Sequence, residues 1–399
     1  MDTYIFDAVR TPIGRGHKEK GALKDIRPVD LILQLTEALE QRNNISDNIV
    51  DELILGATSQ VLEQGGNLAK IAMSYLGWDN VPGTSINSYC SSGMSALFIG
   101  AGKVGSGLSD ILLVGGVEML SRVPMYSDKS PLYFDKSYLE NTRFTQMGVS
   151  ADLIATIKGY SRKELDQYAV LSHKRAANAI QKGYFNNMLI PVKNNNAEVV
   201  LDCDENVKPN TSLEILKKFE PIFKKAVTPF ITKEISKLYL KEKSLQHHHH
   251  IGNSPNMSDG ACLILVGNKE SGKKLGLKPR AKIKTITIQA VEPLQMLNGG
   301  QLAALKAFEK TGLTSKDMDY HYYAEAFSSS CLKYLEELNV DIDIFNPNGG
   351  TMSMGHAQGA SGASLTGLLL EELERTDKEI GVASISGLAM GTSVIVERV

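Results

Sequence analysis

The feature of this chain that most restricts its fold is a strand–loop–helix–strand pattern that occurs twice, once near each end. In the first half, a strand-like segment at 85–87 leads through a polar loop into a helix of small residues and then into an apolar strand at 111–116. In the second half, residues 345–348 lead through a glycine-rich loop into a helix at 360–372 and a strand at 380–387. Strands that alternate with helices favour a parallel sheet that is covered on both faces. The pattern therefore predicts an α/β protein built from a duplicated unit.

The region between these two units differs from both, because it is polar, rich in lysine and poor in strand signals. It contains one well-marked helix, which begins at Ser161 with Glu164 in a capping box and ends at Gly183. We interpret this region as a lobe inserted over the core. The expected domains are an N-terminal core domain at 1–119, a loop domain at 120–246, a return to the N-terminal core domain at 247–266 and a C-terminal core domain at 267–399.

The composition narrows the class of protein. A chain of 399 residues is longer than one hydrophobic core usually covers, which agrees with several domains. A formal net charge of -2 argues against a nucleic-acid partner, since such proteins usually carry a basic excess. No apolar run reaches the length of a membrane span, and the first ten residues do not resemble a secretion signal. The four cysteines lie far apart without metal-site spacing, so we expect reduced thiols and a cytoplasmic protein.

Cys90 stands in the loop of the first unit, where a strand-like approach ends and a helix begins. A cysteine at this place faces the unpaired N–H groups and the positive end of the helix dipole. The setting is expected to lower the thiol pKa below about 8.5 and to favour the reactive thiolate. From this segment alone, Cys90 is either a nucleophile or a small, inert, buried side chain.

His356 stands in the corresponding loop of the second unit, among glycines at 346–362. A lone histidine is often structural, but glycines bury little and make a packed core site less suitable. An imidazole beside a thiol can take its proton and stabilise the thiolate. The pair Cys90 and His356 is therefore a candidate for nucleophilic catalysis.

Together, the Cys90 and His356 segments resemble those of the thiolase family, whose members cleave or form 3-oxoacyl-CoA. The resemblance runs almost from end to end, and its motifs follow in the same order. It includes further segments at 10–14, 115–121, 147–148, 258–261 and 325–327, together with the Ser161 helix and Asn253.

The resemblance implies two similar α/β core domains that together form five layers, with a loop domain over the active site. It implies that Cys90 becomes acylated and that His356 activates it. The N–H groups of Cys90 and Gly387 would form an oxyanion hole, and such fixed donors typically contribute about 3 kcal/mol to lowering a barrier. The positions that match the CoA-binding side of the family are Met147, Lys208 and Ser254, with Lys208 where many members have arginine.

The chain departs from the family at a second catalytic position. A thiolase normally carries a cysteine near its C-terminus as acid and base, but this chain has no cysteine after Cys331. The family's cysteine falls at Ile385 or, with a small shift, at Ser384 or Ser386. Isoleucine cannot move a proton. Ser384 and Ser386 are possible substitutes, although a hydroxyl has a far higher pKa than a thiol.

A second departure concerns the other oxyanion site. Many thiolases have an asparagine where Ala324 stands, and another branch has a histidine there with its cysteine two positions later. Neither arrangement is present. His321 and Cys331 lie nearby in the sequence as further candidates for the lost function.

An insertion of about twenty residues precedes Gly252, and it contains several lysines before the tract His247–His250. The histidines form either a loose metal site or, as we expect, part of a solvated surface loop without metal. The lysines either attract the phosphates of CoA or form a solvated helix face.

These features predict an acyl-CoA C-acyltransferase that forms an acyl-cysteine intermediate and cleaves or forms 3-oxoacyl-CoA. One alternative is a degenerate thiolase that passes the acyl group to another acceptor, as a hydrolase does. Another is a subunit with little turnover that binds acyl-CoA or a partner. The resemblance implies acyl-CoA and CoA as ligands, no cofactor other than these substrates, and a homodimer or homotetramer.

Overall fold

The computed structural model of the protein describes residues 1–241 and 243–399. Its main sheet has ten strands, of which nine follow the order β10-β11-β12-β9-β1-β8-β5-β3-β4, while β2 pairs with β8. The strands are β1 (Thr3–Arg10), β2 (Gly14–Arg15), β3 (Glu52–Gly56), β4 (Gly83–Ile86), β5 (Ile111–Met119), β8 (Ser258–Asn268), β9 (Ala281–Ala290), β10 (Tyr320–Tyr323), β11 (Ile380–Ser386) and β12 (Met390–Arg398).

The sheet consists of two halves that meet where β1 pairs with β9, through Tyr4 opposite Lys282 and Ile5 opposite Ala281. The first half contains β1, β3, β4 and β5 together with β8, which returns to it after the inserted lobe and pairs with both β1 and β5. The second half contains β9 to β12. The two halves correspond to the two units that the sequence predicts.

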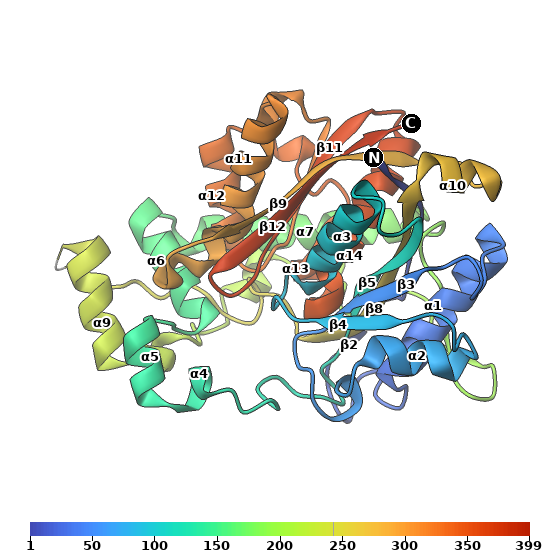
Figure 1. Ribbon diagram of the computed structural model, residues 1–399. Coiled ribbons are helices and arrows are strands. Elements are labelled where there is room, and N and C mark those ends of the chain that lie inside the picture. The colour runs from blue at the N-terminus through green and yellow to red at the C-terminus, as the bar shows by residue number, and fades with distance from the viewer. Residues whose placement is uncertain (242) are drawn as a thin grey trace.

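Helices cover both halves and also fill the space between them (Figure 1). The helices α1 (Pro28–Asn43) and α2 (Leu68–Leu76) pack on the outer face of the first half, and α11 (Gly299–Thr311) and α12 (Ser328–Leu338) on that of the second. Between the halves lie α3 (Ser92–Gly105) and α14 (Gln358–Arg375). The result is the expected five-layer α/β architecture.

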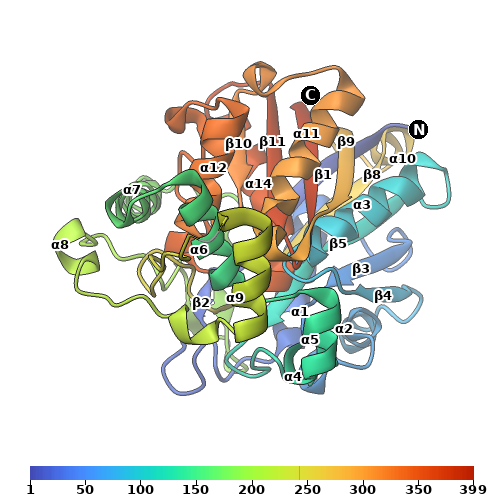
Figure 2. The ribbon, with the colours of Figure 1, turned by 90° about the vertical axis from the view of Figure 1, so that its left-hand side faces the viewer.

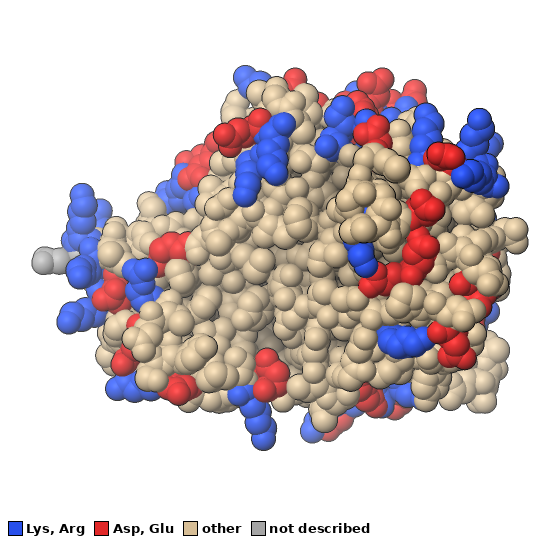
Figure 3. Space-filling view, in the orientation of Figure 1, with Lys and Arg blue, Asp and Glu red and all other residues tan. Residues whose placement is uncertain are grey.

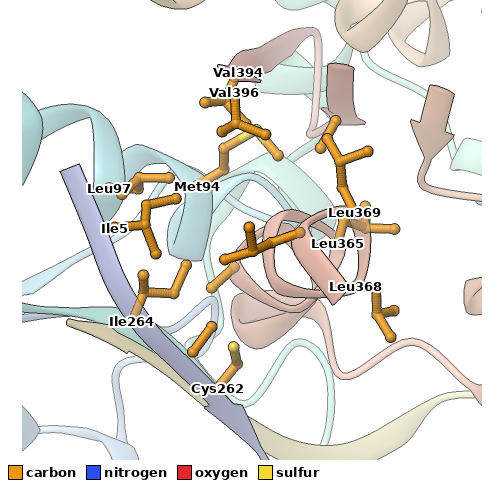
Figure 4. Close-up of a cluster of buried hydrophobic side chains, with 14 of the residues drawn as sticks. Ile5, Met94, Leu97, Cys262, Ile264, Leu365, Leu368, Leu369, Val394 and Val396 are labelled. Carbon is orange, nitrogen blue, oxygen red and sulfur yellow. The ribbon is translucent and has the colours of Figure 1, made fainter. Parts of the chain in front are cut away.

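The two central helices pack closely because glycines face each other's backbone. A Cβ atom on Gly93 of α3 would lie 2.7 Å from the carbonyl oxygen of Gly359, so a side chain there would force the helices apart. Figure 4 shows Met94 and Leu97 of α3 with Leu365 and Leu369 of α14 in the surrounding apolar core. The duplicated units therefore place the N-terminal ends of α3 and α14 next to each other.

The elements of the inserted lobe are α4 (Pro131–Phe134), α5 (Lys136–Thr142), α6 (Met147–Lys158), α7 (Arg162–Gln181), β6 (Val192–Lys193), β7 (Val199–Leu201), α8 (Leu213–Leu216) and α9 (Pro229–Ile235). Much of the lobe, including α4, α5, α6 and α9, lies to one side of the sheet in Figure 1 and toward the viewer in Figure 2. The expected capping box is confirmed at α7, where the Ser161 N–H donates to Glu164 Oε2 over 2.7 Å. The remaining short helices are α10 (Lys269–Lys274) and α13 (Thr351–Met354).

The strand expected at 111–116 continues to Met119, because Gly115 and Gly116 pair with Leu263 and Cys262 and do not end the ladder. Within the described ranges, 1–241 and 243–399, no helix is long and apolar enough to cross a membrane.

Candidate active site

A tight turn holds Cys90 at the N-terminal end of α3. Tyr89, directly before it, has a φ of 54°, in the left-handed region that side-chain-bearing residues rarely adopt. The turn is fixed by hydrogen bonds: the Tyr89 N–H donates to Asn87 Oδ1 over 2.8 Å, and the Ser92 hydroxyl donates to the Tyr89 carbonyl over 2.6 Å. The same hydroxyl accepts from the Ser88 N–H over 2.9 Å. A residue with a strained backbone conformation therefore helps to hold this thiol in position.

Burial governs the protonation of Cys90, whose side chain is only 4% exposed. Burial, with a smaller contribution from the charge of Glu118, raises the pKa of the Cys90 thiol to about 12, although a hydrogen bond from its own N–H acts in the other direction. The expectation that the helix end lowers this pKa is therefore wrong, because burial outweighs it. Cys90 rests as a neutral thiol and needs a base when it reacts.

His356 is suited to be that base. Its Nδ1 lies 2.8 Å from the Ser361 hydroxyl, which itself donates to the Ala357 carbonyl over 3.1 Å. Because that hydroxyl proton is already used, we assign the imidazole proton to Nδ1, which leaves Nε2 as an acceptor. Nε2 is buried without a hydrogen-bond partner among the described residues. Burial lowers the pKa of His356 to about 4, so the ring is neutral near pH 7.

The contact between α3 and α14 brings the Cys90 and His356 loops to the same place. Gly93 stands three residues after Cys90, Gly359 three residues after His356, and these two glycines touch. Glu118 supports the junction, since its buried carboxylate accepts from the Gly359 N–H over 2.9 Å and from the Thr58 hydroxyl over 2.6 Å. A neutral thiol and an imidazole acceptor thus occupy two adjacent helix ends.

A cavity of about 440 Å³ opens at Cys90. Its walls come mostly from the inserted lobe and are largely apolar or aromatic. The lining residues include Cys90, Tyr126, Tyr133, Met147 and Ile231. A cavity of this size and character is typical of small-molecule sites.

Gly387 lies against the Cys90 turn, as the resemblance implies. A Cβ atom on Gly387 would lie 2.9 Å from the Ser88 carbonyl oxygen and 3.1 Å from the Ser91 hydroxyl. Its N–H, however, donates to the Met390 carbonyl over 2.7 Å within the β11–β12 turn. Its role as an oxyanion donor stays a prediction, which requires this N–H to be shared or released.

Ile385 faces the catalytic layer, whereas the two serines beside it do not. On the paired strand β12, Thr392 lies opposite Ile385, and its hydroxyl is 3.4 Å from that of Ser95 on α3. Neighbouring residues of a strand point to opposite faces. The face that lacks a thiol is therefore occupied by an aliphatic side chain.

Ser384 and Ser386 point toward α11 and α12 on the other side of the sheet. The Ser384 hydroxyl lies 2.8 Å from that of Ser393, and the Ser386 hydroxyl donates to the Leu297 carbonyl over 2.7 Å. This placement contradicts the expectation that either serine substitutes for the missing cysteine, because the sheet separates them from Cys90.

The other candidates for the lost function also lie in the outer layer. His321 is held by the Tyr334 hydroxyl and the Ser315 carbonyl, each at 3.0 Å, and Cys331 packs in the same cluster. The structure thus does not bring them to Cys90. Ala324 belongs to the central cluster that contains Cys90, and its methyl group offers no hydrogen bond.

The three predicted CoA-binding residues fall in different places. Met147, the first residue of α6, lines the cavity with Cys90. Lys208 is exposed, and Ser254 is buried with a hydroxyl that has no partner among the described residues. Neither of these two lines the cavity.

The tract His247–His250 is not part of a solvated loop. His249 and His250 are fully buried. The Asp152 carboxylate pairs with Nδ1 of His247 and Nδ1 of His249, both at 2.7 Å, and Asp166 with Nε2 of His250 at 2.8 Å. No group of three or more His, Cys, Asp or Glu side chains within 1–241 and 243–399 could hold a metal ion. Through its bonds to Asp152 and Asp166, the tract is joined to α6 and α7 of the inserted lobe.

Sequence reasoning missed most of the cavity wall. The aromatic residues Tyr126, Tyr133, Phe134 and Phe144 line it, although they belong to a region interpreted as polar and loop-rich. Their concentration within a short stretch was the available signal. Ser361, which orients His356, carried no signal beyond its place among small residues.

Comparisons with known proteins agree with this fold. The N-terminal part matches the family described as "Thiolase, N-terminal domain" over residues 3–232, and the C-terminal part matches "Thiolase, C-terminal domain" over residues 277–398. The 3-ketoacyl-CoA thiolase of Psychrobacter sp. (strain PRwf-1) is 34% identical over 407 residues, which cover 100% of this chain and 98% of the relative. That of Alcanivorax borkumensis is 34% identical over 412 residues, with 100% and 98% coverage.

Solved structures give the same result. The Bacillus anthracis acetyl-CoA acetyltransferase has a TM-score of 0.86 at 29% identity, covering 100% of this chain and 99% of that one. Human mitochondrial 3-ketoacyl-CoA thiolase in complex with CoA has a TM-score of 0.87 at 27% identity, with 100% and 98% coverage. The fold and the cysteine site define an acyl-transfer enzyme. The chain belongs to the thiolase family, and its enzyme class is that of the thiolase acyltransferases.

Proposed function

We propose that this thiolase cleaves or forms 3-oxoacyl-CoA by way of an acyl group carried on Cys90. The observation that carries the proposal is the place of Cys90, at a helix end beside the His356 loop and on the wall of a largely apolar cavity. The names of its relatives, which are 3-ketoacyl-CoA thiolases, support the same substrate.

In the cleavage direction, Sγ of Cys90 attacks the C3 carbonyl of the 3-oxoacyl-CoA while Nε2 of His356 accepts the thiol proton. The C2–C3 bond then breaks, which leaves the acyl group on Cys90 and the two-carbon part as the enolate of acetyl-CoA. One proton converts this enolate into acetyl-CoA. The thiol of free CoA next attacks the acyl-enzyme, which yields acyl-CoA and returns a proton to Cys90.

We propose that the proton for the enolate comes from His356. Ile385 and Ala324 carry no transferable proton, and the serines beside Ile385 lie across the sheet. The imidazolium formed when Cys90 reacts can deliver that proton itself. One group then serves two steps, and we expect C–C cleavage to be slower than acylation by a simple acyl-CoA, by about two to four orders of magnitude.

A second candidate function follows from the same observation. Acylation of Cys90 by acyl-CoA needs no carbanion, so it survives the loss of the second cysteine. The acyl group would then pass to water or to another nucleophile. This candidate is favoured only if the acyl-enzyme forms and free CoA does not complete a thiolytic cycle.

The proposal also covers the cofactor requirement, the oligomeric state and the cellular compartment of the protein. The thioester already supplies an activated acyl group, so the reaction needs no cofactor beyond CoA and its thioesters. We propose a homodimer or homotetramer, supported by the exposed apolar side chains of Tyr75 on α2 and of Phe98 and Ile99 on α3. The middle of the face seen in Figure 3 carries few charges. A reducing compartment such as the cytoplasm would keep Cys90 as a thiol.

Intact-mass spectrometry tests the proposal. The protein is mixed with acetyl-CoA, octanoyl-CoA or a 3-oxoacyl-CoA, and the acyl adduct is mapped; free CoA is then added and acyl-CoA release is followed. We expect an adduct on Cys90, none in Cys90→Ala, and release of acyl-CoA. An adduct that CoA does not discharge supports the second candidate, and adduct formation by the Cys90→Ala protein would overturn both.

A further inference from the structure

We propose that the insertion before Gly252 forms the end wall of the acyl pocket and that Ile231 on α9 sets the chain length of the acyl group. The inference rests on the proposed function, because it takes Cys90 as the atom that carries the acyl group. It assigns the inserted residues a role in substrate selection, with a linear apolar chain of medium length as the preferred acyl group.

The geometry begins at Cys90. An acyl group bound to its sulfur has to extend into the space that opens on that atom, which is the cavity of about 440 Å³. A methylene group occupies about as much space as a water molecule, roughly 30 Å³, so the cavity far exceeds an acetyl group. It suits a chain on the order of eight carbons with part of the CoA arm beside it.

Two segments of the inserted lobe enclose this cavity. The segment at 125–147, which includes α4 and α5, contributes most of the aromatic wall. The opposite side comes from Ala226, Thr228 and Ile231, at the start of the insertion and on α9. Figures 1 and 2 both show α9 beside α5. Residues of both segments line the cavity, so the insertion supplies one of its walls.

Ile231 is fixed in position by a small core of its own. Its side chain is 3% exposed and packs in a cluster with Val149 and Leu153 of α6 and with Ile235 one turn further along α9. Thr228 caps the helix by accepting from the Ile231 N–H over 3.2 Å. A wall residue held from behind in this way yields little, and a chain that reaches it meets a defined end.

The charged groups of the wall lie at its rim. Asp128 and Lys225 line the cavity and both are exposed, whereas Ile231 is buried. Lys233, the one lysine of α9, is exposed and does not line the cavity. The depth of the cavity is thus uncharged, which favours an alkyl chain over a polar or carboxylated acyl group.

The test measures the rate constants for acylation of Cys90 by acetyl-CoA, octanoyl-CoA and dodecanoyl-CoA in the intact protein. In the wild type, we expect octanoyl-CoA to react fastest. Ile231→Phe shortens the pocket and should lower the octanoyl-to-acetyl ratio by about tenfold or more, since a methylene without room loses about fourfold. Ile231→Ala lengthens the pocket and should raise the dodecanoyl-to-octanoyl ratio by about fourfold or more.

Ile235→Ala is the matched control. Ile235 is 2% exposed and lies in the same apolar cluster, but it does not line the cavity. We expect its loss to lower the melting temperature about as much as Ile231→Ala while leaving both chain-length ratios within twofold of the wild type. A merely structural role of Ile231 predicts the same result for both variants.

The outcomes separate this inference from the proposed function. Acetyl-CoA labelling of Cys90 with unchanged chain-length ratios in both Ile231 variants overturns the inference alone. A wild type that accepts acetyl-CoA and not octanoyl-CoA does the same. Absence of labelling by every acyl-CoA overturns the proposed function, and the inference falls with it.

Discussion

The Nδ1 atom of His356 lies 2.8 Å from the hydroxyl of Ser361, one turn into α14. This contact decides which nitrogen of the ring is free. Because the hydroxyl donates to the Ala357 carbonyl over 3.1 Å, it can only accept from His356, and Nε2 is left unprotonated and buried. The reactivity of Cys90, whose pKa burial raises to about 12, depends on that nitrogen.

Removal of the Ser361 hydroxyl should therefore slow the acylation of Cys90. We expect Ser361→Ala to lower the rate constant for Cys90 acylation by about 2- to 10-fold, the equivalent of one neutral hydrogen bond of roughly 0.5–1.5 kcal/mol. Stopped-time mass spectrometry with octanoyl-CoA measures this rate. Ser361→Thr, which keeps the hydroxyl, should restore it.

Ser364→Ala serves as a control on the same helix, since Ser364 is also buried but is not bonded to His356. Its acylation rate should stay near that of the wild type. Equal losses in Ser361→Ala and Ser364→Ala would show that the effect comes from helix packing and not from the tautomer.

Ile385→Cys should restore a proton carrier to the catalytic layer. Ile385 lies on the face that Thr392 shares with Ser95 of α3, so a thiol there points toward the Cys90 side of the sheet. We expect thiolysis of 3-oxoacyl-CoA to rise by about 100-fold, the lower limit for a placed acid or base. The assay follows loss of the 3-oxoacyl-CoA absorbance on addition of CoA.

Ser384→Cys and Ser386→Cys are the matched controls, because both side chains point to α11 and α12. Neither should raise thiolysis. If all three cysteine variants have the same activity, the face of the strand does not matter and the explanation for the weak step is wrong.

Asp152→Asn should destabilise the inserted lobe. Asp152 is fully buried and accepts from Nδ1 of His247 and of His249 at 2.7 Å, and from the N–H groups of His248 and His249. Burial raises the pKa of this carboxyl, but these hydrogen bonds outweigh it and hold the pKa below its ordinary value. An amide cannot accept as many, so we expect a loss of about 2–4 kcal/mol in the free energy of unfolding.

Urea unfolding measures that loss. Asp135→Asn is the comparison, since Asp135 is exposed in the same lobe and caps the short helix α5. It should cost much less than Asp152→Asn, because asparagine caps a helix about as well as aspartate. A smaller effect for Asp152 than for Asp135 would contradict the role given to the histidine tract.

The sequence predicts the core because the strands and helices of the core are visible in the spacing of apolar residues and in the local composition. The apolar strands and the small-residue helices after Cys90 and His356 predict a duplicated α/β unit, and the resemblance to thiolases implies the five layers. The contact between the two helix ends became visible only in the structure. The lobe was harder to predict because its order depends on contacts between distant residues. In the sequence, His249 belongs to a histidine tract that is typical of a solvated loop. In the structure, His249 is buried, and Asp152 of α6 bonds to its ring. Likewise, the sign of the Cys90 pKa shift depends on burial, which the local helix end does not reveal.

Acid should destabilise the protein through three buried histidines. Burial lowers the pKa of His356, His321 and His173 to about 4, with a further contribution from Lys208 at His173. In the unfolded chain each titrates near 6.5. Below about pH 6.5 the unfolded state therefore binds protons that the folded state does not, and stability falls as the pH falls toward 4.

The change in the free energy of unfolding with pH can be measured. Each histidine removes about 1.4 kcal/mol per pH unit within that window, or about 2 kcal/mol between pH 7 and pH 5. His356→Asn takes away one of the three sites. Urea unfolding of this variant should accordingly show a loss between pH 7 and pH 5 that is about 2 kcal/mol smaller than in the wild type. An equal loss in the two proteins would mean that His356 takes up its proton at the same pH in the folded and the unfolded chain, so that burial does not keep its ring neutral below about pH 6.5.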